Sequence, residues 1–515
     1  MYHCAAERQT LLTMAALPIK RGPFKERQKA MPPSLHQHIL GQFEGQTDIG
    51  SVNHPGACKY DMGQQTYSIA GAGANIWANH DDFHFAWKRM TGDFIVTART
   101  AFVGVGANAH RKLGWMARTN LDTDSPHAST GVHGDGLLSL QYRRQQGGPT
   151  EEVQAPLNGA DVIQLERRGT TYIMSVAQYG DPFTAVEAAD IDLGDDIYVG
   201  VFVCSHEDDT IEQATFRDVR IVVPVKDDFN RGRDPFASHL ELLHIDDGQR
   251  QIVHSADSVL EAPNWTRDGK ALIYNSGGRL YHFDLDTRTS SPIDTGDVIG
   301  NNNDHVLSFD GSMLAISSSS KEDNASIVYT VPTAGGQPQR ITPTGPSYLH
   351  GWSADDKYLV YTGQRNGEFD IYRIPADGGE ETQLTTSAGL NDGPEYTPDG
   401  EYIYFNSVRS GRMQIWRMKP DGSDQEQLTD DEYNNWFPHI SPDGQSIAFV
   451  SYLVGEVEPS DHPAAKRVYL RLMPRDGGAP KVLAYLYGGQ GTMNVPSWSP
   501  DGKQLAFVSN TVPHP

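Results

Sequence analysis

Polar side chains recur in the carboxy-terminal half of this 515-residue chain, each time shortly before a Ser/Thr-x-Asp-Gly turn. The side chains that share this position include Asp304, His305, His350, Asp392, Glu395, His439 and Asn494. Imidazole together with carboxylate can bind a divalent metal, or act as acid and base on a sugar acid. The pattern therefore predicts a ligand-binding cluster, while polar side chains that only hydrate a water-filled channel would give the same pattern.

Arginine and tryptophan are the other candidate ligand-binding residues. Arg365 and Arg409 lie in the segments expected to surround the cluster, and a guanidinium fork suits carboxylate or phosphate groups. Trp436 offers a ring that could stack on a sugar. The candidate metal ligands are His305, His350 and His439, and a divalent ion (Ca²⁺, Mn²⁺ or Zn²⁺) is the one cofactor that the sequence suggests.

No spacing in the chain is diagnostic of a known catalytic site. The HExxH, CxxC and GxSxG patterns and the Walker and Rossmann glycine patterns are missing from the sequence. Catalytic residues therefore stay unassigned, and whether the protein is an enzyme stays open.

The turns that follow these polar positions form a repeat. Six copies occur, at residues 265–269, 307–311, 352–356, 396–400, 440–444 and 498–502, and their Asp residues are 42, 45, 44, 44 and 58 positions apart. A period of about 40–45 residues with strand-turn-strand content is typical of the blades of a WD40-like β-propeller. We expect a six-bladed propeller over residues 238–510, with its loops gathered at one end of a central channel.

The last repeat supplies only the first two strands of its blade before the chain ends. The missing strands are available upstream, at residues 239–254, which are apolar and strand-like. Pairing strands from both ends of the propeller would leave the ring without an open edge. The sequence therefore predicts that residues 239–254 close the propeller.

Residues 41–225 are short alternating strands separated by Gly, Asp and Asn turns, which is typical of an all-β sandwich. Residues 226–237 are expected to be a linker. One strand near residue 115 should place Leu113, Trp115 and Ala117 in the core. The opposite side chains and their neighbours form a candidate ligand face, made of His110, Lys112, Arg118 and His133.

The bulk composition limits the partners of the protein. The formal net charge of −24 disfavours nucleic acid, and no apolar stretch reaches the 18–20 residues that a membrane span needs. Three cysteines, Cys4, Cys58 and Cys204, imply no disulfide framework. Residues 1–40 are expected to be a disordered tail or a mis-called start. As encoded the protein is expected in the cytoplasm; a mis-called start would make it periplasmic or secreted.

The repeats resemble the TolB-type propeller, whose blades carry the Trp-Ser-Pro-Asp-Gly signature found here at 498–502. Residues 60–221, with the Tyr-Ser-Ile-Ala-Gly-Ala-Gly run at 67–73, look like the concanavalin-like jelly roll that often accompanies carbohydrate-active modules. The whole chain is similar to bacterial proteins labelled TolB- or TolR-like biopolymer transporters. This resemblance implies an all-β fold with a jelly roll followed by a six-bladed propeller.

Three functions are compatible with these features. The first is a carbohydrate-directed binding protein that could process an acidic glycan in the propeller channel, as a polysaccharide lyase or glycoside hydrolase. The alternative is a non-enzymatic TolB-like scaffold that binds a protein or peptide at the propeller face. A third is a cytosolic sensor whose two domains close on a small anion. The expected ligand is accordingly a glycan, a small anion or a peptide.

Overall fold

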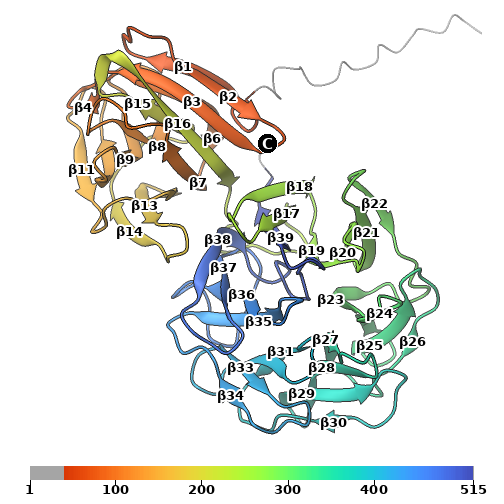
Figure 1. Ribbon diagram of the computed structural model, residues 1–515. Coiled ribbons are helices and arrows are strands. Elements are labelled where there is room, and N and C mark those ends of the chain that lie inside the picture. The colour runs from red at the N-terminus through yellow and green to blue at the C-terminus, as the bar shows by residue number, and fades with distance from the viewer. Residues whose placement is uncertain (1–39, 514–515) are drawn as a thin grey trace, which may run out of the picture.

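The computed structural model describes residues 40–513, and every regular element in that range is a β-strand (Figure 1). The all-β prediction is confirmed for that range. No helix among these residues is long and apolar enough to cross a membrane. The predicted tail at residues 1–40 lies, except for its last position, outside the described residues.

Two seven-stranded antiparallel sheets and a small ribbon make up the first unit (Figure 1). The first sheet has the order β1 (Gly45–Ile49), β6 (Phe83–Thr91), β15 (Asp196–Cys204), β8 (Lys112–Arg118), β9 (His127–His133), β10 (Leu138–Arg143) and β11 (Glu151–Gln154). The second has the order β14 (Thr184–Ala188), β13 (Thr171–Ala177), β12 (Val162–Arg168), β7 (Phe94–Phe102), β16 (Glu207–Val222), β3 (Thr66–Gly73) and β2 (Ala57–Asp61). The ribbon consists of β4 (Ile76–Trp77) and β5 (His80–Asp81).

One hydrophobic core joins the two sheets of the first unit. Trp115 of β8 and Val201 of β15 belong to the same buried cluster as Ile69 of β3 and Leu165 of β12. Side chains alternate between the two faces of a strand, so each sheet contributes one face to this core. The predicted core positions 113, 115 and 117 are all in it. The concanavalin-like jelly-roll assignment stays a prediction.

The second unit is a six-bladed β-propeller, as predicted (Figure 1). The first blade consists of β19 (Glu261–Trp265), β20 (Ala271–Ser276), β21 (Arg279–Asp284) and β22 (Thr289–Pro292). The second consists of β23 (Asn301–Leu307), β24 (Met313–Ser320), β25 (Ala325–Pro332) and β26 (Gln339–Arg340), and the third of β27 (Ser347–Trp352), β28 (Tyr358–Arg365), β29 (Glu368–Pro375) and β30 (Thr382–Gln383). The fourth consists of β31 (Asn391–Tyr396), β32 (Ile403–Ser407), β33 (Gln414–Met418) and β34 (Glu426–Gln427), and the fifth of β35 (Asn434–Ile440), β36 (Ser446–Tyr452), β37 (Lys466–Pro474) and β38 (Lys481–Gly488).

The sixth blade combines strands from both ends of the propeller. Its sheet has the order β18 (Arg250–Ala256), β17 (Ala237–His244) and β39 (Gln504–Thr511), and Trp498 bridges to Leu505 at the position of the first strand. Eight consecutive residue pairs join β17 to β39, from Ala237 with Thr511 to His244 with Gln504. The ring consequently has no unpaired edge at this point. Residues 223–236 run from β16 to β17 without a strand.

The repeated turn has the same construction in each blade. The hydroxyl of its Ser or Thr donates to the Asp carboxylate, as Ser353 does to Asp355 at 2.7 Å. Glycine follows in five turns with φ between 68° and 75°, a region that other residues enter at a cost. Asp356 occupies this place in the third blade, with φ 57°. Its carboxylate accepts the backbone N–H groups of Phe309 and Asp310 in the neighbouring turn, which compensates for the strained backbone.

Candidate functional site

A cavity of about 630 Å³ lies where the innermost strands β23, β27, β31 and β35 begin, and we call it the funnel. Its lining residues are Asn302, Asn303, Asp304, Tyr348, His350, Thr362, Phe369, Leu390, Asp392, Phe437, Ser460, His462, Gln490 and Asn494. Four of the predicted ligand residues are therefore brought together, namely Asp304, His350, Asp392 and Asn494. The polar segments before the repeated turns do gather at one end of the propeller.

The innermost strands reach the funnel through irregular pairing. The register with the second strand shifts between Asn301 and His305, between Leu349 and Gly351, between Asp392 and Glu395, and between Trp436 and His439. Such an irregularity turns side chains away from strict alternation. The repeated shifts therefore decide which polar residues face the cavity and which face a neighbouring blade.

An ion pair between His350 and Asp392 forms one side of the funnel. The imidazole Nε2 lies 3.3 Å from Asp392 Oδ1, which also accepts the Thr362 hydroxyl at 2.7 Å and the Gly393 N–H at 2.8 Å. Burial alone raises the pKa of Asp392, but the hydrogen bond and charge of His350 outweigh it and lower this pKa to about 2. Burial lowers the pKa of His350, and the two neighbouring aspartates outweigh that effect and raise it. Each partner therefore favours the charged form of the other.

Asp304 is the second carboxylate of the funnel, and its surroundings differ. Within residues 40–513, the side chain that donates to it is that of Asn302, at 2.9 Å. Burial raises the pKa of Asp304 to about 7, and the charges of Asp392 and Glu261 add to this effect although His350 opposes it. Asp304 thus changes charge close to neutral pH, and within residues 40–513 it forms no ion pair, although the nearby charge of His350 acts on it.

Aromatic rings form the walls of the funnel. Tyr348, Phe369 and Phe437 line it, and Phe437 has φ 56°, an unusual value for a bulky residue. Trp436 is fully buried behind them, with its ring centroid 4.1 Å from that of His462. Because His462 covers it, Trp436 does not present a free ring face to a sugar, contrary to the prediction.

The three predicted metal ligands do not converge. His305 Nε2 lies 3.1 Å from a backbone carbonyl oxygen, and His439 is held between Glu395, at 2.6 Å, and another backbone carbonyl, at 3.0 Å. Of the three histidines, only His350 lines the funnel. The three histidines therefore do not form the predicted metal site. Glu395, which was also predicted to bind the ligand, does not line the funnel either. The reason is that His305, Glu395 and His439 point into the contacts between blades.

The two predicted rim arginines are engaged by the protein itself. Arg365 pairs with Glu381 at 2.5 Å, and Arg409 donates to Asn391 at 2.8 Å and to Gln425 at 2.5 Å. Neither arginine lines the funnel. The predicted ring of cations for an acidic ligand is thus not present there.

Sequence reasoning misses several lining residues, above all the apolar ones and His462. Tyr348, Phe369, Leu390 and Phe437 lie in or beside strands and are indistinguishable by pattern from core residues. His462 did carry a signal, because it belongs to the insertion that lengthens the last repeat interval to 58 residues. Long loops at a propeller face often carry function.

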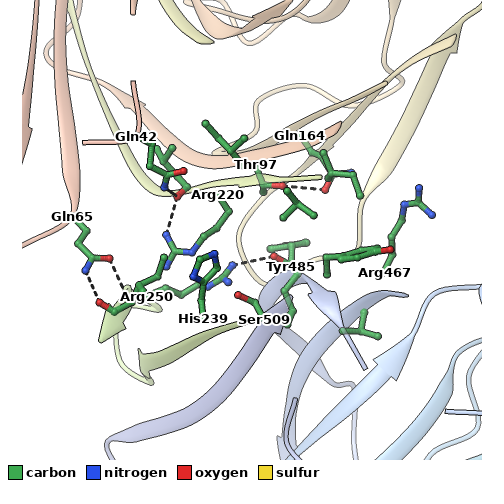
Figure 2. A pocket seen from close by; sticks show the side chains of 18 of the residues that line it. Gln42, Gln65, Thr97, Gln164, Arg220, His239, Arg250, Arg467, Tyr485 and Ser509 are labelled. Atoms are coloured by element: carbon green, nitrogen blue, oxygen red, sulfur yellow. Dashed lines mark hydrogen bonds between the residues drawn. The ribbon is translucent and has the colours of Figure 1, made fainter. Parts of the chain in front are cut away.

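A second cavity, of about 400 Å³, lies between the two units (Figure 2). Arg220 of β16 and Arg250 of β18 both donate to Glu241 of β17, at 2.6 and 2.9 Å, and Ser509 donates to the same carboxylate at 2.5 Å. Burial raises the pKa of Glu241, but the two guanidinium groups outweigh it and hold this pKa well below its usual range. Two of the arginines that line this cavity, Arg220 and Arg250, are therefore paired with the buried Glu241.

Further hydrogen bonds cross between the units around this cavity. The side-chain amide of Gln65, labelled in Figure 2, donates to the Ile252 carbonyl at 2.8 Å. The Tyr179 hydroxyl donates to the Leu483 carbonyl at 3.0 Å. Arg467 of the propeller also pairs with Glu166 of the first unit. These contacts identify the cavity as the interior of an interface that fixes the two units together.

The predicted ligand face of the first unit is largely covered. Of its four residues only His110 is exposed. Lys112 Nζ donates to Asn75 Oδ1 at 2.7 Å, and Arg118 lies fully buried, 3.5 Å from Asp81. The prediction of an open polar face is wrong for Lys112 and Arg118, because the segment that contains β4 and β5 packs over them.

Comparisons with known proteins identify relatives of the propeller. Residues 350–468 match the family model described as the TolB beta propeller domain. An uncharacterised protein of Agrobacterium fabrum is 47% identical over 272 residues, which are 53% of this chain and 92% of that protein. A solved TolB-type structure from Agrobacterium tumefaciens is 46% identical over 53% of this chain and 98% of its own, with a TM-score of 0.52. TolB from Acinetobacter baumannii is 21% identical over 49% of this chain and 64% of its own, with a TM-score of 0.40. By the family model and the two Agrobacterium matches, the chain belongs to the TolB-like β-propeller family.

Proposed function

We propose that this protein is a non-enzymatic TolB-like interaction scaffold whose funnel binds a peptide segment that carries a positive charge next to an aromatic or apolar side chain. One observation carries the proposal: the funnel combines the carboxylate of Asp304 with aromatic walls, and no Lys or Arg occurs among its described lining residues. Concave sites with apolar walls and a few convergent polar groups are the usual form of ligand pockets.

The charge of the bound group follows from the two carboxylates. Asp392 is paired with His350, whereas the one side chain that donates to Asp304 within the described part of the chain is the amide of Asn302. A lysine, arginine or amino terminus placed beside Asp304 would favour its ionised form and gain a charge-assisted hydrogen bond. Tyr348, Phe369 and Phe437 would contact the neighbouring apolar side chain.

An acidic glycan suits the funnel less well. Arg365 and Arg409 are engaged elsewhere, and Trp436 is covered by His462. A uronic acid would therefore place its carboxylate near Asp304 and Asp392 without a compensating arginine, which is unfavourable. The concanavalin-like first unit is proposed to act as a platform docked rigidly on the propeller.

The test is binding of labelled short peptides to the full chain, measured by fluorescence anisotropy at about pH 8. A Lys-Phe peptide should bind, and a Glu-Phe peptide of the same length should bind at least tenfold more weakly. Asp304→Asn should weaken Lys-Phe binding about tenfold, the loss expected for one charge-assisted contact. Asp297→Asn, an exposed carboxylate outside the funnel, is the matched control and should bind like wild type. Equal binding of both peptides, or an unaffected Asp304→Asn variant, would refute the proposal.

A further inference from the structure

Three chain segments meet at one end of the first sheet, away from the residues that line the funnel. β8 lies between β15 and β9 and is antiparallel to both. The start of β8 therefore lies beside the ends of both neighbours, and Lys112 pairs with Cys204 on one side and with His133 on the other. Residues just outside these strand ends must come close together.

Two histidines and an aspartate are the residues that meet there. The ligand atoms of His110, His133 and Asp135 all lie within 4.8 Å of one another, and His110 Nδ1 is 3.6 Å from Asp135 Oδ2. The backbone fixes this approach, because the Asp135 N–H donates to the Ala109 carbonyl at 2.8 Å. Within residues 40–513 this is the one such group of three or more His, Cys, Asp or Glu side chains.

Two imidazole nitrogens near this position lack partners among the described residues, while His133 Nε2 lies 3.4 Å from the Ser139 hydroxyl oxygen. His133 is 5% exposed, and its Nδ1 has no hydrogen-bond partner among the described residues. The Nδ1 atom of His206, whose ring centroid lies 5.6 Å from that of His110, is likewise buried without a partner. Buried polar atoms are normally bonded, so these nitrogens call for a further group.

We infer that His110, His133 and Asp135 form a binding site for a divalent transition metal of the zinc class. Two imidazoles and one carboxylate are ligands that Zn²⁺ accepts, with a fourth position left for water or for His206. Tetrahedral ligands about 2.0 Å from the ion lie roughly 3.3 Å apart. The side chains of His110 and Asp135 are 57% and 37% exposed, so both are free to close that distance around the ion.

The charges around the site are compatible with a bound cation. Lys112 is a positive charge that acts on His133, and its ammonium donates to Asn75 Oδ1 at 2.7 Å and to the Ile76 carbonyl at 3.3 Å. The carboxylates of Asp135 and Glu152 act on His133 in the opposite sense. The site is separate from the funnel, and neither proposal depends on the other.

The experiment uses the full chain without a histidine tag, stripped with chelator and titrated with Zn²⁺ by isothermal calorimetry, with bound metal counted by elemental analysis. Wild type should bind one equivalent. His110→Ala and Asp135→Asn should each weaken binding at least tenfold. Because both side chains are substantially exposed, neither change should disturb folding, which circular dichroism checks.

His80→Ala is the matched control. His80 also pairs with an aspartate, Asp82, at 3.2 Å in the same unit, but belongs to no group of three such ligands among the described residues. The His80→Ala variant should bind Zn²⁺ as tightly as wild type. Cobalt substitution gives a second readout, since the visible bands of tetrahedral Co²⁺ should appear in wild type and be lost in His110→Ala. The inference is overturned if wild type binds no ion, or if His110→Ala and Asp135→Asn bind as tightly as His80→Ala.

Discussion

Replacing Asp304 with asparagine is expected to stabilise the protein above pH 7 and to leave its stability unchanged near pH 4. Burial, together with the charges of Asp392 and Glu261, raises the pKa of this carboxyl from 3.8 to about 7 in the folded state. Between these values the folded protein holds a proton that the unfolded chain lacks. Stability therefore falls as the pH rises from about 4 to about 7 and stays lower above that range.

The magnitude follows from the same shift. A pKa that folding raises by about three units corresponds to a loss of about 4 kcal/mol in the free energy of unfolding at pH 8, at 1.36 kcal/mol per unit. Asparagine removes the charge but keeps an oxygen that can accept the hydrogen bond from Asn302, which spans 2.9 Å in the wild type. The variant should therefore gain up to about 4 kcal/mol in free energy of unfolding at pH 8 and almost nothing at about pH 4.

Denaturant unfolding of wild type and Asp304→Asn across this pH range measures the effect. Subtracting the two free energies of unfolding removes the contribution of every other group that titrates alike in both proteins. Asp297→Asn, which alters an exposed carboxylate, should show a difference that stays near zero at every pH. If the difference between Asp304→Asn and wild type does not grow with pH, the raised pKa of the buried Asp304 carboxyl is refuted.

Three further predictions concern the interface and the closure of the ring. Glu241→Gln should destabilise the protein by about 3–5 kcal/mol in denaturant unfolding, because two buried guanidinium groups lose their partner, whereas exposed Glu187→Gln should change little. This contribution is present above about pH 4.3 and should be lost on acidification, since the pKa of Glu241 is depressed in the folded state; equal acid sensitivity in Glu241→Gln would contradict it. Tyr179→Phe removes one hydrogen bond between the units and should cost about 1 kcal/mol, and no loss would mean that the bond contributes nothing. Deleting residues 238–256 should abolish cooperative unfolding of the propeller in calorimetry, and a wild-type melting curve would contradict closure by β17 and β18.

The propeller could be predicted because its signal is local and repeated. Each blade contains the same turn, in which a hydroxyl donates to an aspartate and glycine takes a positive φ, so the sequence must repeat these residue types. The polar segments before these turns gather because all blades present the same end. Asp304, His350, Asp392 and Asn494 accordingly line one cavity, and their role as ligand-binding residues stays a prediction.

The choice of residues within the site was less predictable. Asp304 lines the funnel and His305, its neighbour, does not, since successive strand side chains alternate and His305 Nε2 lies 3.1 Å from the Ile273 carbonyl oxygen of the neighbouring blade. The partner of Arg365 is 16 residues away, and nothing in the pattern assigns it to Glu381. Lys112 and Arg118 are covered by a segment whose two strands are only two residues long, too short for any periodic signal.

The most direct test of the peptide-binding proposal is the pH dependence of Lys-Phe peptide affinity. Asp304 must be ionised to bind the cation, and burial raises its pKa to about 7. Affinity measured by anisotropy should rise severalfold from about pH 6 to about pH 8 in wild type and stay flat in Asp304→Asn. The proposal would be contradicted by an affinity that is independent of pH in wild type, or by the same rise in the variant.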